Sequence, residues 1–233
     1  MQSPVIHRVT SLDLTVQRRP WPFADARRAE IDAHFATQRR ARSGLWNGRV
    51  LLGRDPVFAD RRFSANYFET DFASFLAWRD WGFPDKDVFN GFGMGALLAS
   101  DGAFALGEMG QHTSNAGRIY FPSGTPDLDD IRGDTVDIAG SVLRELEEET
   151  GLTAADCRAD ADWHCIHTGP AVAMIRILRV DMPGEALRAR LEANLARQQD
   201  PELAAIHLVR GRADFTATMP RFVTAFIETQ LSV

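Results

Sequence analysis

The sequence comprises 233 residues, of which 45% are hydrophobic and 25% are charged, and its formal net charge is −6. This composition is typical of a globular protein with one large domain, or with one domain and an extension. The negative charge argues against nucleic acid and anionic membranes as partners, and no apolar run approaches the ~18 residues that would span a bilayer. Two cysteines, Cys157 and Cys165, are too few for a disulfide framework or a zinc site. No signal peptide is visible, so a cytoplasmic protein is expected.

Residues 1–84 are predicted to form an N-terminal extension that packs on the rest of the chain and ends in the turn cluster "GFPDKD". Hydrophobic periodicity and turn residues predict its elements. In chain order they are a strand over 5–16, a helix over 22–43 that Gly44 terminates, strands within 49–70 and an aromatic-rich helix over 72–82.

Residues 85–233 are predicted to form the main domain. Asp101 and Gly102 separate two apolar runs and indicate a β-hairpin. The elements expected after it are a strand over 117–124, a polar loop over 125–135, a helix over 137–150, strands over 163–169 and 172–182, a helix over 184–200, a strand over 202–209 and a helix over 219–231. Strands and helices are interspersed, so we predict an α/β class with a mixed sheet flanked by helices.

The helix predicted over 137–150 carries a concentration of glutamates at its C-terminal end. Glu145, Glu148 and Glu149 fall at i, i+3 and i+4, beside an apolar stripe that packs inward. Glutamates at this end face the negative end of the helix dipole and also repel one another. Mg²⁺ or Mn²⁺ would relieve that repulsion, because carboxylate oxygens are the ligands that these ions prefer. We therefore predict half of a metal site; the alternative is a solvated acidic face.

The segment from Arg144 to Leu152, "RELEEETGL", fits the pattern Arg-Glu-U-x-Glu-Glu-x-Gly-U, where U is aliphatic. It resembles the second half of the Nudix box, the signature of hydrolases that act on nucleoside diphosphates linked to another moiety. The resemblance implies a Nudix-type α/β/α sandwich with a mixed sheet. It also implies that Glu145, Glu148 and Glu149 are metal ligands, and that Glu145, Glu149 and Arg144 are the catalytic residues. Arg144 would form an ion pair within the box and hold its carboxylates in place.

The first half of the box departs from the family pattern. Asp130 and Val136 occupy the positions where the pattern has Gly and Glu, so the loop before the helix is expected to be lengthened. Asp134 or Asp137 is the candidate replacement for the missing glutamate. Many Nudix proteins also recruit a carboxylate from outside the box. Glu202 is the candidate for that role here, and an ordinary surface glutamate is the alternative.

Two features are used to predict how the substrate binds. Arg118 and His112 flank a turn that precedes the box, where they would contact phosphate or ribose. Core packing is expected first for the aromatic rings of the N-terminal extension, and the alternative is that they wall off a compact substrate pocket. These rings are Phe63, Tyr67, Phe68, Trp78 and Trp81. The glycine-rich "GFGMGA" lacks the spacing of a dinucleotide-binding loop, and we expect it to serve backbone packing.

The stretch over 45–125 also resembles a Nudix subgroup from animals that cleaves UDP-sugars. We therefore predict a metal-dependent pyrophosphohydrolase with Mg²⁺ or Mn²⁺ as cofactor and a small-molecule nucleoside diphosphate derivative, first of all a nucleotide-sugar, as substrate. Its products would be a nucleoside monophosphate and a phosphorylated remainder. The general base would be one of the box glutamates or Glu202. The alternatives are a catalytically silent Nudix-fold module that binds nucleotides, and a coenzyme A or ADP-ribose diphosphatase.

Overall fold

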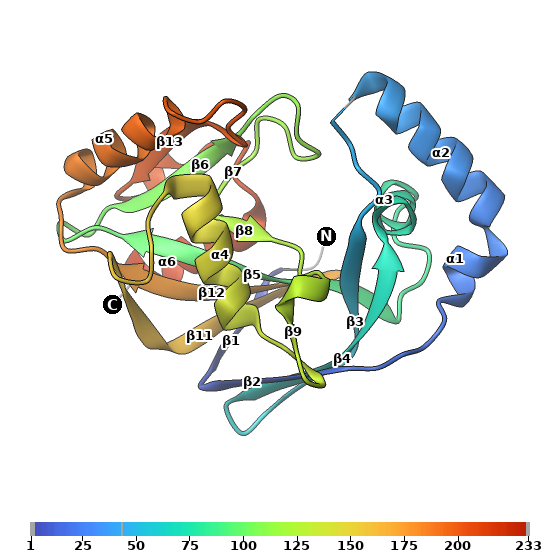
Figure 1. The fold of residues 1–233 in the computed structure, drawn as a ribbon. Helices are drawn as coiled ribbons and strands as arrows, with labels where there is room; N and C mark the ends of the chain where they lie inside the picture. The colour runs from blue at the N-terminus through green and yellow to red at the C-terminus, as the bar shows by residue number, and fades with distance from the viewer. Residues whose placement is uncertain (1–2, 43, 232–233) are drawn as a thin grey trace.

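The computed structural model describes residues 3–42 and 44–231, and a mixed β-sheet forms its centre (Figure 1). The strands are β1 (Val5–Val9), β2 (Ser11–Val16), β3 (Arg49–Ala59), β4 (Arg62–Asp71), β5 (Val88–Leu98), β6 (Phe104–Met109), β7 (Ile119–Tyr120), β8 (Ser123–Gly124), β9 (Ile131–Arg132), β10 (Thr135–Val136), β11 (Arg158–Thr168), β12 (Ala171–Arg179) and β13 (Leu203–Val209). The α-helices are α1 (Pro22–Ala26), α2 (Arg28–Ala41), α3 (Phe72–Asp80), α4 (Ile138–Thr150), α5 (Gly184–Leu195) and α6 (Arg221–Leu231). Two short 3-10 helices are η1 (Leu128–Asp130) and η2 (Arg212–Asp214).

The main path of the sheet among the described residues is β1-β11-β12-β5-β3-β4-β2-β10-β9, and β6 extends from β5 to pair with β13. Strand β5 pairs in parallel with β12, and β2 pairs in parallel with β4, whereas β3 with β4 and β11 with β12 are antiparallel. Parallel and antiparallel pairs in one sheet, with helices around it, confirm the predicted α/β class and mixed sheet.

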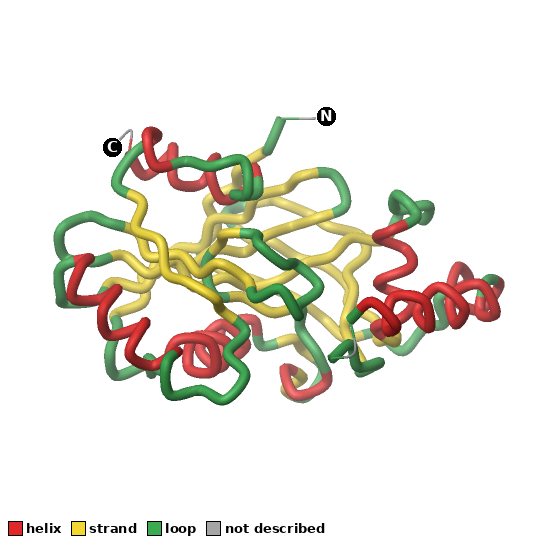
Figure 2. The backbone as a smooth tube through the Cα atoms, turned by 90° about the horizontal axis from the view of Figure 1, so that it is seen from above, coloured by secondary structure: helices red, strands yellow, loops and turns green. Residues whose placement is uncertain are grey.

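Helices cover both faces of the half of the sheet that contains β5, β11 and β12. Figure 2 shows α6, next to the C-terminus, on one side of the strands and helices on the opposite side. Phe226 of α6 packs edge-on against Phe104 and Phe121 beneath it. On the opposite face α4 packs on β5, and α5 lies beside α4. This half of the protein is therefore an α/β/α sandwich.

The N-terminal residues contribute to the same sheet and also build a second hydrophobic core. Strand β1 pairs with β11, so the beginning of the chain is part of the main sheet. Helices α1, α2 and α3 lie together beside β3 and β4, apart from α4 (Figure 1). Their core centres on fully buried residues such as Ile31, Leu76 and Trp78. The division expected at 84/85 falls in the turn before β5, a strand that pairs with both β3 and β12.

Three predicted elements are interrupted in the structure. The strand over 5–16 divides at Thr10, whose backbone amide donates to the carbonyl of Arg61 as the chain moves from β11 to β4. The helix over 22–43 divides at Arg27, and its last predicted residue, Ser43, lies outside the described residues. The loop over 125–135 contains η1, β9 and β10, because β10 covers the open edge of β2. No helix among the described residues is long and apolar enough to cross a membrane.

Candidate functional site

The glutamate-rich segment forms α4, as predicted, and sequence signals define both of its ends. Asp137 is the N-cap residue, and its side chain accepts a hydrogen bond of 2.9 Å from the amide of Gly140. Gly151 ends the helix in the left-handed conformation with φ of 70°, which a residue with a Cβ adopts only with strain. The helix is thus fixed in length, and the glutamates occupy its last two turns.

Glycines of β5 allow α4 to lie close to the sheet. A Cβ at Gly93 would come within 2.6 Å of a methyl group of Val142 and within 2.8 Å of one of Ile138. A Cβ at Gly95 would meet Leu178 at 2.7 Å. The "GFGMGA" segment therefore serves backbone packing, as expected, and its role is to set the depth at which α4 holds its carboxylates.

The structure brings the predicted metal ligands together with the predicted external carboxylate. Glu145, Glu148 and Glu149 line a small cavity of about 330 Å³, and Glu202, just before β13, lines the same cavity. Glu149 is 4% exposed and the Glu145 side chain is 14% exposed, whereas the Glu148 side chain is 60% exposed. The segment that carries Glu202 is held near α4, because the side chain of Gln198 donates to the carbonyl of Glu148 at 2.9 Å.

Burial and mutual repulsion make this cluster unfavourable as a set of free anions. Burial raises the pKa of Glu145 to about 7, the adjacent Arg144 opposes this, and Glu148 and Glu202 add to it. The pKa of Glu149 is raised well above its ordinary value by burial and by the charges of Glu145 and Glu202. Neither carboxylate oxygen of Glu149 completes a hydrogen bond, although the backbone amide of Ser123 favours its charged form. A buried acid without partners is a candidate ligand of a cation.

The cluster fits a divalent cation by its chemistry. No three His, Cys, Asp or Glu side chains in the described parts of the chain already converge as a complete ligand set. The carboxylates that share the small cavity nevertheless supply only hard oxygen donors, and Glu149 has two buried oxygens without a hydrogen-bond partner. Mg²⁺ and Mn²⁺ prefer such oxygens and often retain several waters, so they do not require a complete protein cage.

Arg144 braces the cluster through a residue that the sequence did not identify. Its guanidinium donates to both carboxylate oxygens of Asp130 at 3.1 Å and lies 2.9 Å from Glu145. Asp130 is 3% exposed and accepts the backbone amide of Asp127 at 3.0 Å. The candidates Asp134 and Asp137 do not contact Arg144. Asp134 is exposed in the turn between β9 and β10, and Asp137 caps α4.

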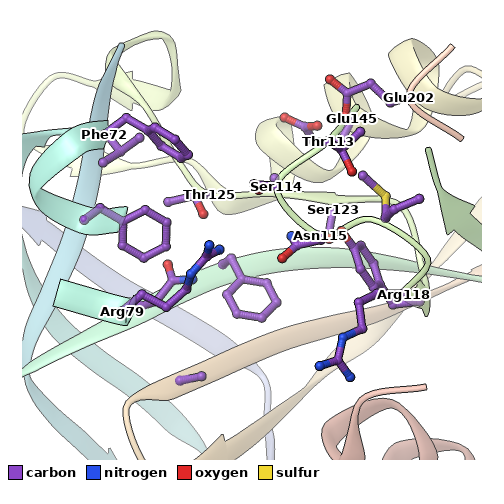
Figure 3. Close-up of a pocket in the computed structure, with 18 of the residues that line it drawn as sticks. Phe72, Arg79, Thr113, Ser114, Asn115, Arg118, Ser123, Thr125, Glu145 and Glu202 are labelled. Carbon is purple, nitrogen blue, oxygen red and sulfur yellow. Dashed lines mark hydrogen bonds between the residues drawn. The ribbon is translucent and has the colours of Figure 1, made fainter. Parts of the chain in front are cut away.

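The carboxylates open onto a larger cavity of about 910 Å³, which Glu145 and Glu202 also line. Figure 3 shows Glu145 and Glu202 at one end of the view and Arg79 and Arg118 away from them. One wall is formed by residues 44–83 of the N-terminal region, and the other by β5, the loop over 110–118 and the segment before α4. The cavity therefore lies between the predicted N-terminal extension, residues 1–84, and the predicted main domain, residues 85–233.

Both residues predicted to bind substrate line this large cavity. Arg118 follows the turn over 110–117, and its backbone carbonyl accepts the amide of Met109 at 2.9 Å. His112 lies at the other end of the turn, with its side chain 45% exposed and 3.8 Å from a carboxylate oxygen of Asp200. Arg79 of α3 and Asn90 of β5 are among the polar lining residues that the sequence did not single out.

The aromatic rings of the N-terminal extension pack in the protein interior, as expected, and the alternative that they wall off the pocket was wrong. Phe63, Tyr67, Phe68 and Trp78 are at most 1% exposed and belong to the hydrophobic cores, while Trp81 stacks on Arg27. The aromatic residues that do line the cavity are Trp46, Phe72, Phe75, Phe83, Phe92, Tyr120 and Phe222. Periodicity could have separated these sets in part, because alternate residues of a strand face opposite sides.

No protein-family model matches the sequence, and a search of curated proteins finds no match. Similar solved structures include RenU, a Nudix hydrolase from M. smegmatis, which is 14% identical, with 63% of this chain and 90% of that chain covered and a TM-score of 0.41. An Ap4A hydrolase from C. elegans is 12% identical, with coverages of 61% and 99% and a TM-score of 0.39. A bifunctional NMN adenylyltransferase/ADP ribose pyrophosphatase from Francisella tularensis is 14% identical, with coverages of 68% and 45% and a TM-score of 0.41. Several of the structural neighbours are thus Nudix hydrolases.

Proposed function

We propose that this protein is a Nudix-type, metal-dependent pyrophosphohydrolase that cleaves a nucleoside diphosphate linked to another moiety. The observation that carries the proposal is the cluster of Glu145, Glu148, Glu149 and Glu202 at one end of a large cavity that also contains arginines. In an ordinary acidic surface patch all of the carboxyls would be exposed to solvent, whereas Glu145 and Glu149 are largely buried. The box pattern from Arg144 to Leu152 supplies the same residues from the sequence.

Glu145, Glu148, Glu149 and Glu202 would hold Mg²⁺ or Mn²⁺. Such an ion neutralises the charge of a diphosphate and makes a water more acidic. Arg144, fixed by Asp130, keeps the Glu145 carboxylate in place and partly offsets the repulsion within the cluster. Glu145, Asp200 and Glu202 line both cavities, so a substrate in the large cavity would meet these carboxylates. The general base is one of the buried box glutamates or Glu202, since a base must lie within hydrogen-bond reach of the attacking water.

We propose a nucleotide-sugar as the substrate, with a UDP-sugar first. A cavity of about 910 Å³ accommodates a small molecule of this size, and its lining combines aromatic rings with a few hydrogen-bonding groups. Arg118 and Arg79 are the cations available for the phosphates or for other acceptor groups. The net charge of −6 provides no broad basic surface for a nucleic-acid strand.

A product assay tests the proposal. The purified protein is incubated with UDP-glucose, ADP-glucose, ADP-ribose, coenzyme A and dinucleoside polyphosphates, with Mg²⁺, with Mn²⁺ or with a chelator, and the products are separated by chromatography. We expect UMP and glucose 1-phosphate from UDP-glucose, only when the metal is present. A tenfold or greater preference for ADP-ribose or coenzyme A over every nucleotide-sugar would refute the substrate proposal. Binding of these compounds without turnover would instead identify a silent nucleotide-binding module.

A further inference from the structure

Asn90 presents an unused hydrogen-bonding group at the large cavity. It lies in β5, and its backbone amide donates to the carbonyl of Pro170 at 2.8 Å, which fixes the position of the residue. Its side-chain oxygen Oδ1 is buried and has no hydrogen-bond partner. A carboxamide carries an acceptor and a donor side by side, and a buried acceptor left unpaired is costly. The side chain is therefore suited to a ligand that supplies a donor at this point.

Arg79 supplies donors in the same cavity. It lies in the last turn of α3, and its Nε is paired with the neighbouring Asp80 at 3.2 Å. Among the described residues, the hydrogen bond that the Arg79 side chain makes is donated by Nε. Figure 3 shows the guanidinium directed from α3 into the cavity. Arg79 can therefore donate to a ligand there without breaking its existing ion pair.

Tyr120 relates Arg79 to the carboxylate cluster. The pKa of Tyr120 is raised, chiefly by burial, and it is also affected by the charges of Glu149 and Glu202 and, in the opposite direction, by Arg79. Tyr120, Arg79, Glu145 and Glu202 all line the large cavity, and Figure 3 shows the two carboxylates at one end of the view and Arg79 away from them. In a nucleoside diphosphate the ribose separates the diphosphate from the base, so a ligand whose diphosphate lies at the carboxylates can extend its base toward Arg79.

We propose that Asn90 and Arg79 recognise the Watson–Crick edge of a uracil-type base, which deepens the proposed function and rests on it. Uracil presents an acceptor, a donor and an acceptor in sequence, from O2, N3–H and O4. The Asn90 Oδ1 accepts from N3–H, its Nδ2 donates to one carbonyl, and Arg79 donates to the other. Phe75, Phe83 and Phe92 line the same cavity and would provide apolar contact for the ring.

The other bases match this donor–acceptor–donor set less well. Cytosine places the acceptor N3 where the structure has the buried acceptor of Asn90. Guanine matches at O6 and N1–H but then presents its amino group to a donor. Adenine can pair with a rotated Asn90 carboxamide, but it offers Arg79 no carbonyl. Sites built to hydrogen-bond one edge reject mismatched analogues strongly, because their own polar groups are then left unpaired.

Binding of nucleoside monophosphates tests the inference separately from turnover. Dissociation constants of UMP, AMP and N3-methyl-UMP are measured by calorimetry with Mg²⁺ for the wild type, Asn90→Ala, the near-isosteric Asn90→Leu and Arg79→Gln. The matched control is Asn115→Ala, since Asn115 lines the same cavity but already donates to the Tyr120 hydroxyl at 3.1 Å. We expect the wild type to bind UMP at least tenfold more tightly than AMP or N3-methyl-UMP.

Asn90→Ala and Asn90→Leu should reduce the preference for UMP over AMP, and the preference for UMP over N3-methyl-UMP, to within about threefold. Arg79→Gln should weaken the binding of UMP more than the binding of AMP, because only contacts to the base are lost. Asn115→Ala should keep the preference. Equal affinities of the wild type for UMP and AMP would overturn the inference. It would also be overturned if an Asn90 or Arg79 variant weakened the binding of UMP and AMP equally, because an equal loss indicates a contact to the phosphate rather than to the base. Hydrolysis of UDP-glucose and ADP-glucose with equal kcat/KM would leave the proposed function standing and remove the inference. A preference for UMP without hydrolysis of any substrate would support the inference and refute the proposed function.

Discussion

Arg144 and Asp130 form a two-point contact in which one terminal nitrogen of the guanidinium lies 3.1 Å from each carboxylate oxygen. The contact joins α4 to η1, the short helix in the loop that precedes α4. The same guanidinium lies 2.9 Å from Glu145, so the position of this proposed metal ligand depends on Asp130, which lies 14 positions before Arg144 in the chain.

Asp130→Asn should destabilise the protein and lower activity together. The change leaves Arg144 without its buried partner, and we expect a loss of about 1–3 kcal/mol in the free energy of unfolding, less than for a fully buried pair because the arginine is partly exposed. Urea unfolding measures the loss, and kcat/KM for UDP-glucose should fall in parallel. Asp134→Asn is the matched control, because Asp134 is exposed and in the same loop. Equal effects of the two changes would show that Asp130 does not brace Arg144.

Glu149→Gln should separate stability from function. The substitution removes one charge from a buried cluster, so the metal-free protein should be as stable as the wild type or more stable. The rise in Tm that Mn²⁺ causes in the wild type should disappear, and kcat should fall by orders of magnitude, about 10²-fold or more for a lost metal ligand or base. Glu147→Gln provides the control, since Glu147 lies on the same helix but lines neither cavity. Near-normal turnover of Glu149→Gln would mean that the cluster is only an acidic face.

Gly93→Ala should push α4 away from the sheet. The added Cβ would lie 2.6 Å from Val142, and overpacking of this kind costs about 1–3 kcal/mol. Activity should fall more than stability alone explains, because the carboxylates move with the helix. Gly211→Ala is the matched change, since no atom lies within 4 Å of a Cβ placed there. Thermal unfolding and kcat/KM of both variants measure the effect, and indistinguishable results would remove the assigned role of Gly93.

The cavity wall formed by α3 should become less stable in acid. Asp71 caps this helix by accepting a hydrogen bond from the amide of Ser74, and it also pairs with Arg28. Burial raises the pKa of Asp71, but the contacts with Arg28 and Ser74 outweigh burial and hold the pKa below its ordinary value. A lowered folded-state pKa means that its stabilisation is present above the unfolded value of about 3.9 and is lost as the pH falls below it. The wild type should therefore be more stable than Asp71→Asn at pH 6, and the difference should shrink as the pH falls toward 3. Urea unfolding across that range tests this, and a constant difference would contradict it.

The sequence predicted local elements well where one signal dominates. Asp137 and Gly151 delimit α4 by capping, and Asp101 and Gly102 form the turn between β5 and β6, so both elements were confirmed. The interruptions at Thr10 and Arg27 were missed, because a change of strand partner or of helix direction depends on tertiary contacts rather than on local propensity.

The site was predicted most fully in its helical part, and Glu202, Arg118 and His112 outside that helix also line the cavities. Spacing along α4 placed Glu145, Glu148 and Glu149 on neighbouring stripes, since helix geometry is regular. Asp130 was missed because its pairing with Arg144 depends on how the loop folds back. Arg79 and Asn90 were missed because they lie in different elements, α3 and β5, and only the tertiary fold brings them to one cavity. Hydrophobicity marks the aromatic residues of this region as apolar, but does not distinguish a core from a cavity wall.

The central claim is that buried glutamates support metal-dependent cleavage of a diphosphate bond. Hydrolysis of UDP-glucose in ¹⁸O-labelled water with Mg²⁺, followed by mass spectrometry, tests this most directly. We predict that the wild type yields UMP and glucose 1-phosphate with one labelled oxygen on only one of them, and that Glu149→Gln yields neither above background. The contradicting result is that UDP-glucose and every other nucleoside diphosphate derivative stay intact with Mg²⁺ and with Mn²⁺, or that Glu149→Gln incorporates label at the wild-type rate.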